Sequence, residues 1–212
     1  MFGIDDALLI KLVTVLGGYV ITKRFTRKQI DLKESDIAIL GDVLVGKTTL
    51  INALQGKFGQ SVFQTHNDNQ VEFERKCNDQ CLKIKVTDFS GSNNNVSKYY
   101  KEILEKCNCV LYLCNINEYL TIQEKRDLNN ARLEWIYKFL PNHDEIPVQV
   151  ILTHADKVKD RNIAKRNFIT FLQTKEYGAL FLKREPLIVE MKKNDELQQF
   201  LPKIDELIFN ND

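Results

Sequence analysis

One stretch of this chain has the residue types and spacing of a phosphate-binding loop. Nine consecutive residues read Gly41-Asp42-Val43-Leu44-Val45-Gly46-Lys47-Thr48-Thr49, and the first eight match the pattern GxxxxGK[ST]. Backbone N–H groups of such a loop face phosphate oxygens, the Lys47 ammonium adds positive charge near the β- and γ-phosphates, and the Thr48 hydroxyl is a ligand for Mg²⁺. We therefore predict that all nine residues contact a nucleotide, and Lys47 is also a candidate catalytic residue.

Two further motifs would complete a nucleotide site. Asp88-Phe89-Ser90-Gly91 closes an apolar strand 41 residues after Lys47. An aspartate there can hold Mg²⁺ through water, and the N–H of Gly91 can reach a γ-phosphate. Thr153-His154-Ala155-Asp156 also follows an apolar strand. A carboxylate at Asp156 can accept hydrogen bonds from N1–H and the N2 amino group of guanine, which adenine cannot supply. Thr153, His154 and Asp156 are therefore predicted to bind the base.

The segments around these motifs alternate between strand-like and helix-like patterns. Apolar runs predict strands, an i, i+3, i+4 periodicity predicts helices, and a turn between two runs predicts one hairpin. The predicted strands are 36–40, 71–77, 82–88, 109–114, 148–153 and 187–191, and the predicted helices are 48–56, 96–107, 128–139, 164–172 and 197–208. This order predicts an α/β fold, a P-loop NTPase G domain. We expect a mostly parallel six-stranded sheet with one antiparallel edge strand and helices on both faces.

The three motifs, in this order and on these elements, resemble the Ras-like GTPase superfamily over residues 36–209. The forms Thr-His-x-Asp and Asp-Phe-x-Gly look like those of Roc domains, the Ras-like modules of large multidomain proteins. The resemblance implies binding of GTP and GDP with Mg²⁺, and hydrolysis of GTP. It also implies a switch-loop threonine that reaches Mg²⁺ and the γ-phosphate. Thr65, 18 residues after Lys47, fits this place as a metal ligand and catalytic residue, with Ser61 as the alternative.

The chain departs from the family pattern at several places. Ser92 stands where many members have a glutamine that orients the attacking water, and Val43 stands where Ras has a small glycine beside the γ-phosphate. His154 replaces the usual lysine of the guanine motif. Glu190-Met191-Lys192 is a poor match to the fifth guanine-binding segment, so no residue is assigned there. We expect hydrolysis to be slow, or to depend on a partner or a dimer.

Three functions are compatible with these motifs. The leading one is a molecular switch, in which the γ-phosphate and Mg²⁺ order loops 58–70 and 89–97, and hydrolysis releases a protein effector or regulator. The alternative is a module that holds GTP constitutively, without hydrolysis, and docks on a membrane or a complex. The third is a small ATP-dependent kinase, which the Asp88–Gly91 and Thr153–Asp156 motifs together argue against. The sequence leaves a homodimer open.

The segment Ala7–Ile21 is nearly all apolar and is followed by four basic residues. We predict a hydrophobic helix with a basic linker over residues 1–34, and a Ras-like G domain over residues 35–212. Fifteen helical residues would span about 22 Å, short of the roughly 30 Å of a bilayer core. Membrane contact and packing on a protein surface are both compatible with this pattern, and a cleaved signal peptide has the least support. The expected location is the cytoplasm, with or without attachment to the cytoplasmic face of a membrane.

Composition excludes other classes. The formal net charge is +1, and no basic run is interleaved with aromatic residues, so nucleic acid is not an expected partner. The five cysteines are an odd number in a chain of 212 residues, which argues against a disulfide framework. Cys77 and Cys81 lack a second ligand pair at a usual spacing, so a zinc site there has little support.

Overall fold

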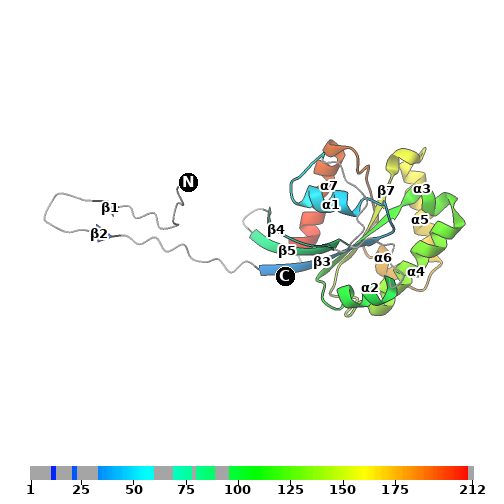
Figure 1. Ribbon diagram of the computed structural model, residues 1–212. Helices are drawn as coiled ribbons and strands as arrows, with labels where there is room; N and C mark the ends of the chain where they lie inside the picture. The colour runs from blue at the N-terminus through cyan, green and yellow to red at the C-terminus, as the bar shows by residue number, and fades with distance from the viewer. Residues whose placement is uncertain are drawn as a thin grey trace. The chain divides into compact units, whose positions relative to one another are not determined.

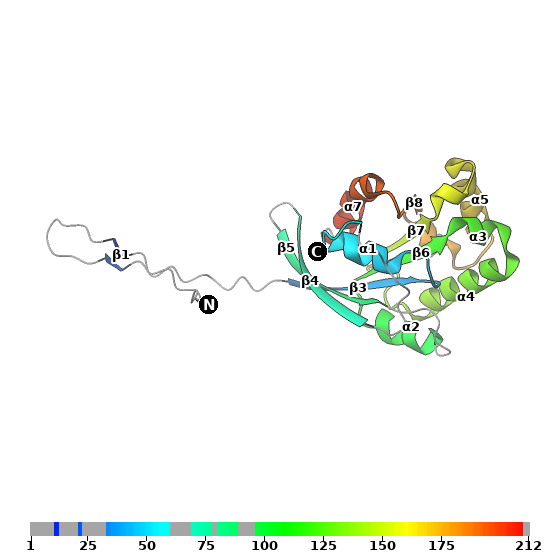
Figure 2. The same cartoon turned by 45° about the horizontal axis from the view of Figure 1, so that its top comes forward.

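The computed structural model describes residues 11–12, 21–22, 33–59, 69–77, 80–88 and 96–209. The chain divides into two units, Met1–Asp31 and Leu32–Asp212. All elements that could form the predicted site belong to the second unit (Figures 1 and 2).

The second unit alternates strands and helices along the chain. Its strands are β3 (Lys33–Gly41), β4 (Asn69–Cys77), β5 (Gln80–Asp88), β6 (Cys109–Asn115), β7 (Val148–Thr153) and β8 (Leu187–Ile188). Its helices are α1 (Lys47–Leu54), α2 (Val96–Leu104), α3 (Ile116–Thr121), α4 (Gln123–Phe139), α5 (Arg161–Gln173), α6 (Gly178–Leu182) and α7 (Asn194–Phe209), with a 3₁₀ turn, η1, at Ala155–Lys157.

These strands form one six-stranded sheet in the order β4-β5-β3-β6-β7-β8. Every neighbouring pair is parallel except β4 and β5, which form the hairpin at the edge of the sheet. The predicted six-stranded sheet with one antiparallel edge strand is confirmed. In this topology β3 lies at the centre, so the loop that leaves its carboxyl end lies in the middle of that end of the sheet.

Alternate residues of the central strands enter two separate cores. Ile37 and Ile39 of β3 join the core under α1 and α7, whereas Ala38 and Leu40 join the core under α2, α4 and α5. Figure 1 shows α1 and α7 on one face of the sheet and α2 and α4 on the other. Burial on both faces explains why the strands appear in the sequence as continuous apolar runs instead of alternating ones.

The structure adds two short helices and shortens one strand. α3 and α6 have 6 and 5 residues, too few to show a helical period in the sequence. The strand expected at 187–191 ends at Ile188, although Val189 still donates a backbone hydrogen bond to Leu152 at 2.9 Å. The residue after Val189, Glu190, accepts a hydrogen bond from the Asp156 N–H in the segment that follows β7.

The described residues of the first unit differ from the expected helix. Lys11–Leu12 (β1) and Ile21–Thr22 (β2) form a two-residue antiparallel pair. The sequence around them is rich in valine, isoleucine and threonine and contains a Gly-Gly pair, a composition that favours strands over helix. The remainder of Ala7–Ile21 lies outside the described residues. Within the described part of the chain, no helix is both long enough and apolar enough to cross a bilayer.

Candidate nucleotide site

The predicted phosphate loop connects β3 to α1 and has the backbone that its glycines allow. Gly41 has φ +146°, and a Cβ on it would lie 2.3 Å from the Leu113 carbonyl oxygen of β6, so only glycine fits beside that strand. Gly46 has φ +97° and forms the N-cap of α1. Leu44, between them, is also left-handed at φ +58°. The result is a tight loop that leads directly into the amino end of a helix, where anions are favoured.

Lys47, the first residue of α1, points its side chain back toward this loop. Its side chain is buried, and its Nζ donates hydrogen bonds to the carbonyl oxygens of Asp42 at 2.6 Å and Gly41 at 3.4 Å. Thr48 and Thr49 follow in the first turn of α1 and are half-buried. The loop therefore places a positive charge and a helix N-terminus together, which is the arrangement that binds phosphate groups.

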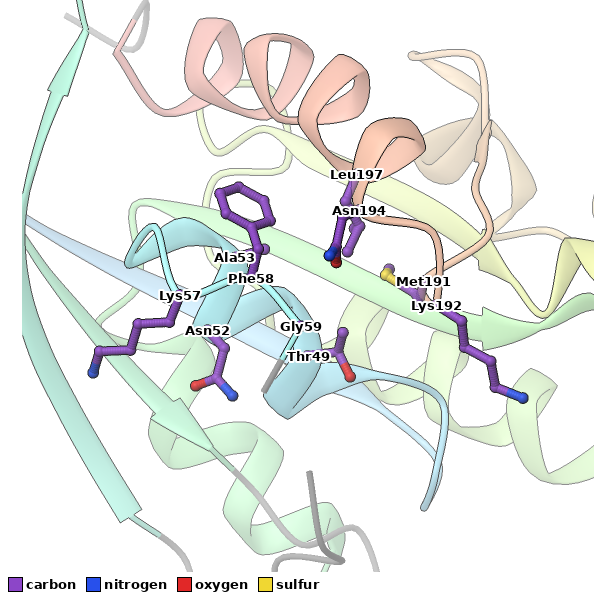
Figure 3. Close-up of a pocket in the computed structure, with 10 residues that line it drawn as sticks. All are labelled: Thr49, Asn52, Ala53, Lys57, Phe58, Gly59, Met191, Lys192, Asn194 and Leu197. Atoms are coloured by element: carbon purple, nitrogen blue, oxygen red, sulfur yellow. The ribbon is translucent and has the colours of Figure 1, made fainter. Parts of the chain in front are cut away.

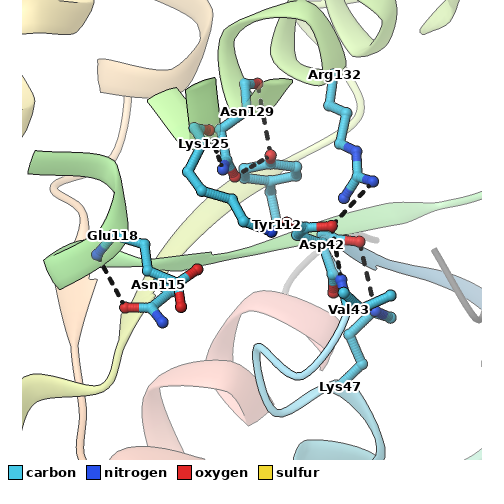
Figure 4. Close-up of polar contacts among 10 residues, drawn as sticks. Asp42, Val43, Lys47, Tyr112, Asn115, Glu118, Lys125, Asn129 and Arg132 are labelled. Carbon is cyan, nitrogen blue, oxygen red and sulfur yellow. Dashed lines mark hydrogen bonds and ion pairs between the residues drawn. The ribbon is translucent and has the colours of Figure 1, made fainter. Parts of the chain in front are cut away.

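Asp42 is a buried carboxylate at the start of the loop, and two cations from α4 reach it (Figure 4). Lys125 Nζ lies 2.9 Å from Oδ2, and Arg132 NH2 lies 3.1 Å from Oδ1, which also accepts the Val43 N–H at 2.8 Å. Burial has the largest influence on this group and opposes its ionisation. The Lys125 hydrogen bond, the Arg132 charge and the Val43 N–H together outweigh burial and hold the pKa of Asp42 below its ordinary value.

The predicted guanine motif lies at the end of β7. Thr153 is buried, and its hydroxyl donates to the Cys114 carbonyl at 3.3 Å and lies 3.1 Å from Nδ1 of His154. His154 is half-buried with φ +58°, and burial is the main reason that its pKa falls below the ordinary value. Asp156 is exposed. Its pKa is lowered, first by hydrogen bonding with Glu190, and burial opposes this; a backbone hydrogen bond and the positive charge of Lys192 add to the lowering.

Glu190, which was not among the predicted site residues, fixes the position of this motif. It is only 2% exposed, and its two carboxylate oxygens accept backbone N–H groups from Asp156 at 2.9 Å and Lys192 at 3.1 Å. Its own N–H donates to Glu196 at 2.8 Å, and Arg161 pairs with Glu196 at 2.5 Å. The only signal in the sequence is an acidic residue at the end of an apolar strand, which by itself does not indicate where its carboxylate points.

A cavity of about 370 Å³ lies between α1, with the residues that follow it, and the start of α7, with the residues that precede it (Figure 3). Its lining residues are Thr49, Asn52, Ala53, Lys57, Phe58, Gly59, Met191, Lys192, Asn194 and Leu197. Met191 connects it to the phosphate loop, because a Cβ on Gly46 would lie 3.1 Å from Met191 Cγ. Lys192 connects it to the guanine motif, because its backbone N–H donates to Glu190, which also accepts the Asp156 N–H. The volume is within the range of small-molecule sites.

Of the other predicted site residues, the structure describes the backbone of Asp88 only. Asp88 ends β5 with its Cα opposite Ile39 of β3, so the backbone of this motif lies beside the strand that carries the phosphate loop. Gly91, Thr65 and the alternative Ser61 lie outside the described residues. Their roles stay predictions.

The fold and the loop define the class of protein. A parallel sheet whose central strand leads through a glycine-bounded loop and a buried lysine into a helix is a P-loop NTPase G domain. This agrees with the fold class predicted from the sequence.

Comparison with known proteins gives the family. The model of the family described as 50S ribosome-binding GTPase matches residues 36–154, more than half of the chain, and the chain belongs to this GTPase family. The solved structure of Methanosarcina barkeri Roco2 RocCORdC bound to GDP is similar, with 19% identity and a TM-score of 0.58. The match covers 84% of this chain and 50% of the Roco2 chain, so this chain spans about half the length of that protein. A search of curated proteins finds no match. The predicted Ras-like GTPase membership is confirmed, and the fold of the chain is similar to that of the Roco2 structure.

Proposed function

We propose that this chain binds GTP and GDP with Mg²⁺ and hydrolyses GTP slowly, or with the help of a partner, as a molecular switch. One observation carries the proposal: residues 190–192 contact both halves of the site. Glu190 holds the backbone of Asp156, and Met191 packs beside Gly46 of the phosphate loop. Residues 190–192 would thereby hold the phosphate loop and the Asp156 carboxylate, which we propose reads guanine, in one site. The GDP in the Roco2 structure is consistent with this ligand.

The base selection that we propose depends on Asp156 and His154. The exposed Asp156 carboxylate accepts two guanine donors, and adenine, with no N1–H and no 2-amino group, would leave it without partners. The lowered pKa keeps His154 neutral at physiological pH, so its flat ring can stack on the base without a charge. His154 would in this way replace the lysine stem that packs on the base in most Ras-like proteins.

Thr48 and Asp88 are the described residues that we propose for Mg²⁺, with Thr65 as the switch-loop ligand. A hydroxyl and a carboxylate are the hard oxygen donors that this ion prefers, and the pairing of Asp88 with Ile39 brings the end of β5 next to the phosphate-loop strand. When bound, the ion supplies positive charge to the phosphate oxygens. Lys47 and the loop N–H groups supply the rest, because catalysis of this kind is mainly positioning and charge stabilisation.

The nucleotide state decides between a cycling switch and the alternative function, a constitutively GTP-bound docking module. Val43 gives the alternative some support. Its branched, half-buried side chain lies in the phosphate loop, where it would crowd an arginine or a water-positioning group from a partner. In the alternative, bound GTP stabilises the chain without being turned over.

The test is to identify the nucleotide released from freshly purified protein on denaturation, followed by single-turnover hydrolysis of GTP with Mg²⁺. The proposal expects GDP, or GDP mixed with GTP, and turnover that is slow but measurable. Stoichiometric GTP with no turnover over days would support the docking module. Fast turnover by the isolated chain would contradict slow or assisted hydrolysis.

A further inference from the structure

Helix α4 has an unusual polar stripe on the side that faces the phosphate loop. Lys125, Asn129 and Arg132 follow one another at intervals of four and three residues, which places them on one face of the helix. Asn129 and Arg132 are 3% and 2% exposed. A buried helix face is normally apolar, as it is at Leu133 and Ile136 of the same helix. Lys125 is partly exposed, with 34% of its side chain accessible. Burying the polar side chains of Asn129 and Arg132 costs free energy unless each has partners, so the contacts of this stripe indicate its role.

The middle residue of the stripe fixes the helix on the sheet. Asn129 Oδ1 accepts a hydrogen bond from the Tyr112 hydroxyl of β6 at 2.7 Å, and its Nδ2 donates to the Lys125 carbonyl at 2.7 Å. Tyr112 is the neighbour of Leu40 in the sheet, one residue before the phosphate loop begins. Asn129 therefore fixes the first turns of α4 relative to β6, beside the start of the phosphate loop (Figure 4).

The outer two residues reach the loop itself. Lys125 and Arg132 bind opposite oxygens of the Asp42 carboxylate, at 2.9 and 3.1 Å. The same residue's carbonyl oxygen accepts the Lys47 ammonium at 2.6 Å. Asp42 thus connects two sets of contacts: its side chain is fixed by α4, and its main chain fixes the lysine that we expect at the phosphates. A rotation of the Asp42 peptide would move that carbonyl and release Lys47.

We propose that Lys125 and Arg132 are positioning residues for the phosphate loop, which act through Asp42 to preorganise Lys47 for the nucleotide phosphates. The inference rests on the proposed nucleotide binding and adds α4 to the residues that set its strength. Preorganised groups bind without first having to be ordered, so loss of the α4 contacts weakens phosphate binding without any change in the groups that touch the phosphates. Binding of the base should be unaffected, because the guanine motif is held by Glu190 and not by α4.

The variant that tests this is Lys125→Met in the full chain, with Lys138→Met as the matched control. Both lysines are on α4 and form ion pairs, but Lys138 is exposed and pairs with Glu134 of the same helix, away from the phosphate loop. Affinities for GDP and for guanosine, which lacks phosphates, are measured by competition against a fluorescent GDP analogue. Lys125→Met is expected to weaken GDP binding about tenfold, the size of one charge-assisted hydrogen bond, and to leave guanosine binding unchanged. Lys138→Met should match the wild type, and Lys125→Arg should restore most of the affinity.

A double-mutant cycle tests the route through Asp42. If Lys125 acts through this carboxylate, Lys125→Met should have little further effect on GDP affinity in an Asp42→Asn background. Wild-type GDP affinity in Lys125→Met, or an equal loss of GDP and guanosine affinity, would overturn the inference, the second because it indicates general destabilisation. Additive losses in the cycle would also overturn it. Absence of GDP binding by the wild-type chain would instead overturn the proposed function.

Discussion

Replacement of Glu190 by glutamine should loosen the guanine motif by an amount that follows from its contacts. The two carboxylate oxygens accept the N–H groups of Asp156 and Lys192, and the side chain is 2% exposed. Glutamine keeps the shape but has one acceptor oxygen, and its amide nitrogen would face the second N–H donor. One charge-assisted hydrogen bond is lost and one donor is left without a partner, a change of about 2 kcal/mol. In a chain of this size, that lowers Tm by about 4–8 °C.

The assay is thermal denaturation without nucleotide, paired with the ratio of the GDP and ADP dissociation constants. Glu190→Gln should lower Tm and reduce the preference for guanine about tenfold, because the backbone of Asp156 is no longer fixed. Glu185→Gln is the control. It lies five residues earlier, and its side chain is 72% exposed in an ion pair with Lys165. Exposed pairs contribute little, so this variant should resemble the wild type. A Glu190→Gln protein with unchanged Tm and unchanged preference would refute the reasoning.

Three further predictions concern stability, pH and the metal. Arg75→Met removes one partner of a largely buried bidentate pair with Asp205 and should lower the free energy of unfolding by about 2–3 kcal/mol; a Tm within a degree of wild type would contradict this. Burial lowers the pKa of His154 below 6.5, so the unfolded chain binds this proton more readily. The His154 contribution to stability should be complete above pH 6.5 and lost as the pH falls through the lower folded-state pKa. Thermal melts from about pH 8 to about pH 5 should therefore show the Tm of wild type falling relative to that of His154→Gln, and a constant difference would count against it. Mg²⁺ should raise the GTP affinity of the wild type above the value measured in EDTA, and Thr48→Ala should abolish most of this increase. A Thr48→Ala variant with the same increase as the wild type would show that Thr48 is not a metal ligand.

The sequence predicted the parts of this protein that depend on local patterns. The phosphate loop was recognisable because its glycines, lysine and threonine lie within eight residues and between two periodic segments. The strands of the sheet were recognisable because burial on both faces gives uninterrupted apolar runs, such as 109–114.

Contacts between distant residues were not predictable in the same way. Asp42 and Lys125 are 83 residues apart, and nothing local to either indicates that they meet. Asp156 and Glu190 are 34 residues apart and meet only because β7 and β8 are neighbours in the sheet. The apolar periodicity of α4 also concealed its polar stripe, because a helix that buries Leu133 and Ile136 is fully explained by packing. Topology, not composition, brought these groups together.

The most direct test of guanine-nucleotide binding is a titration of nucleotide-free protein with GDP, GTP and ADP in the presence of Mg²⁺, for the wild type, Asp156→Asn and Asp160→Asn. Asp160 is the matched control, since it is exposed and caps α5, a role that asparagine fills equally well. We expect GDP and GTP to bind to the wild type and to Asp160→Asn, with ADP at least about a hundredfold weaker, and Asp156→Asn to lose about a hundredfold in GDP affinity. Equal binding of GDP and ADP by the wild type, or an Asp156→Asn variant that still prefers guanine, would contradict the assignment of this chain as a guanine-nucleotide-binding protein that reads its base through Asp156.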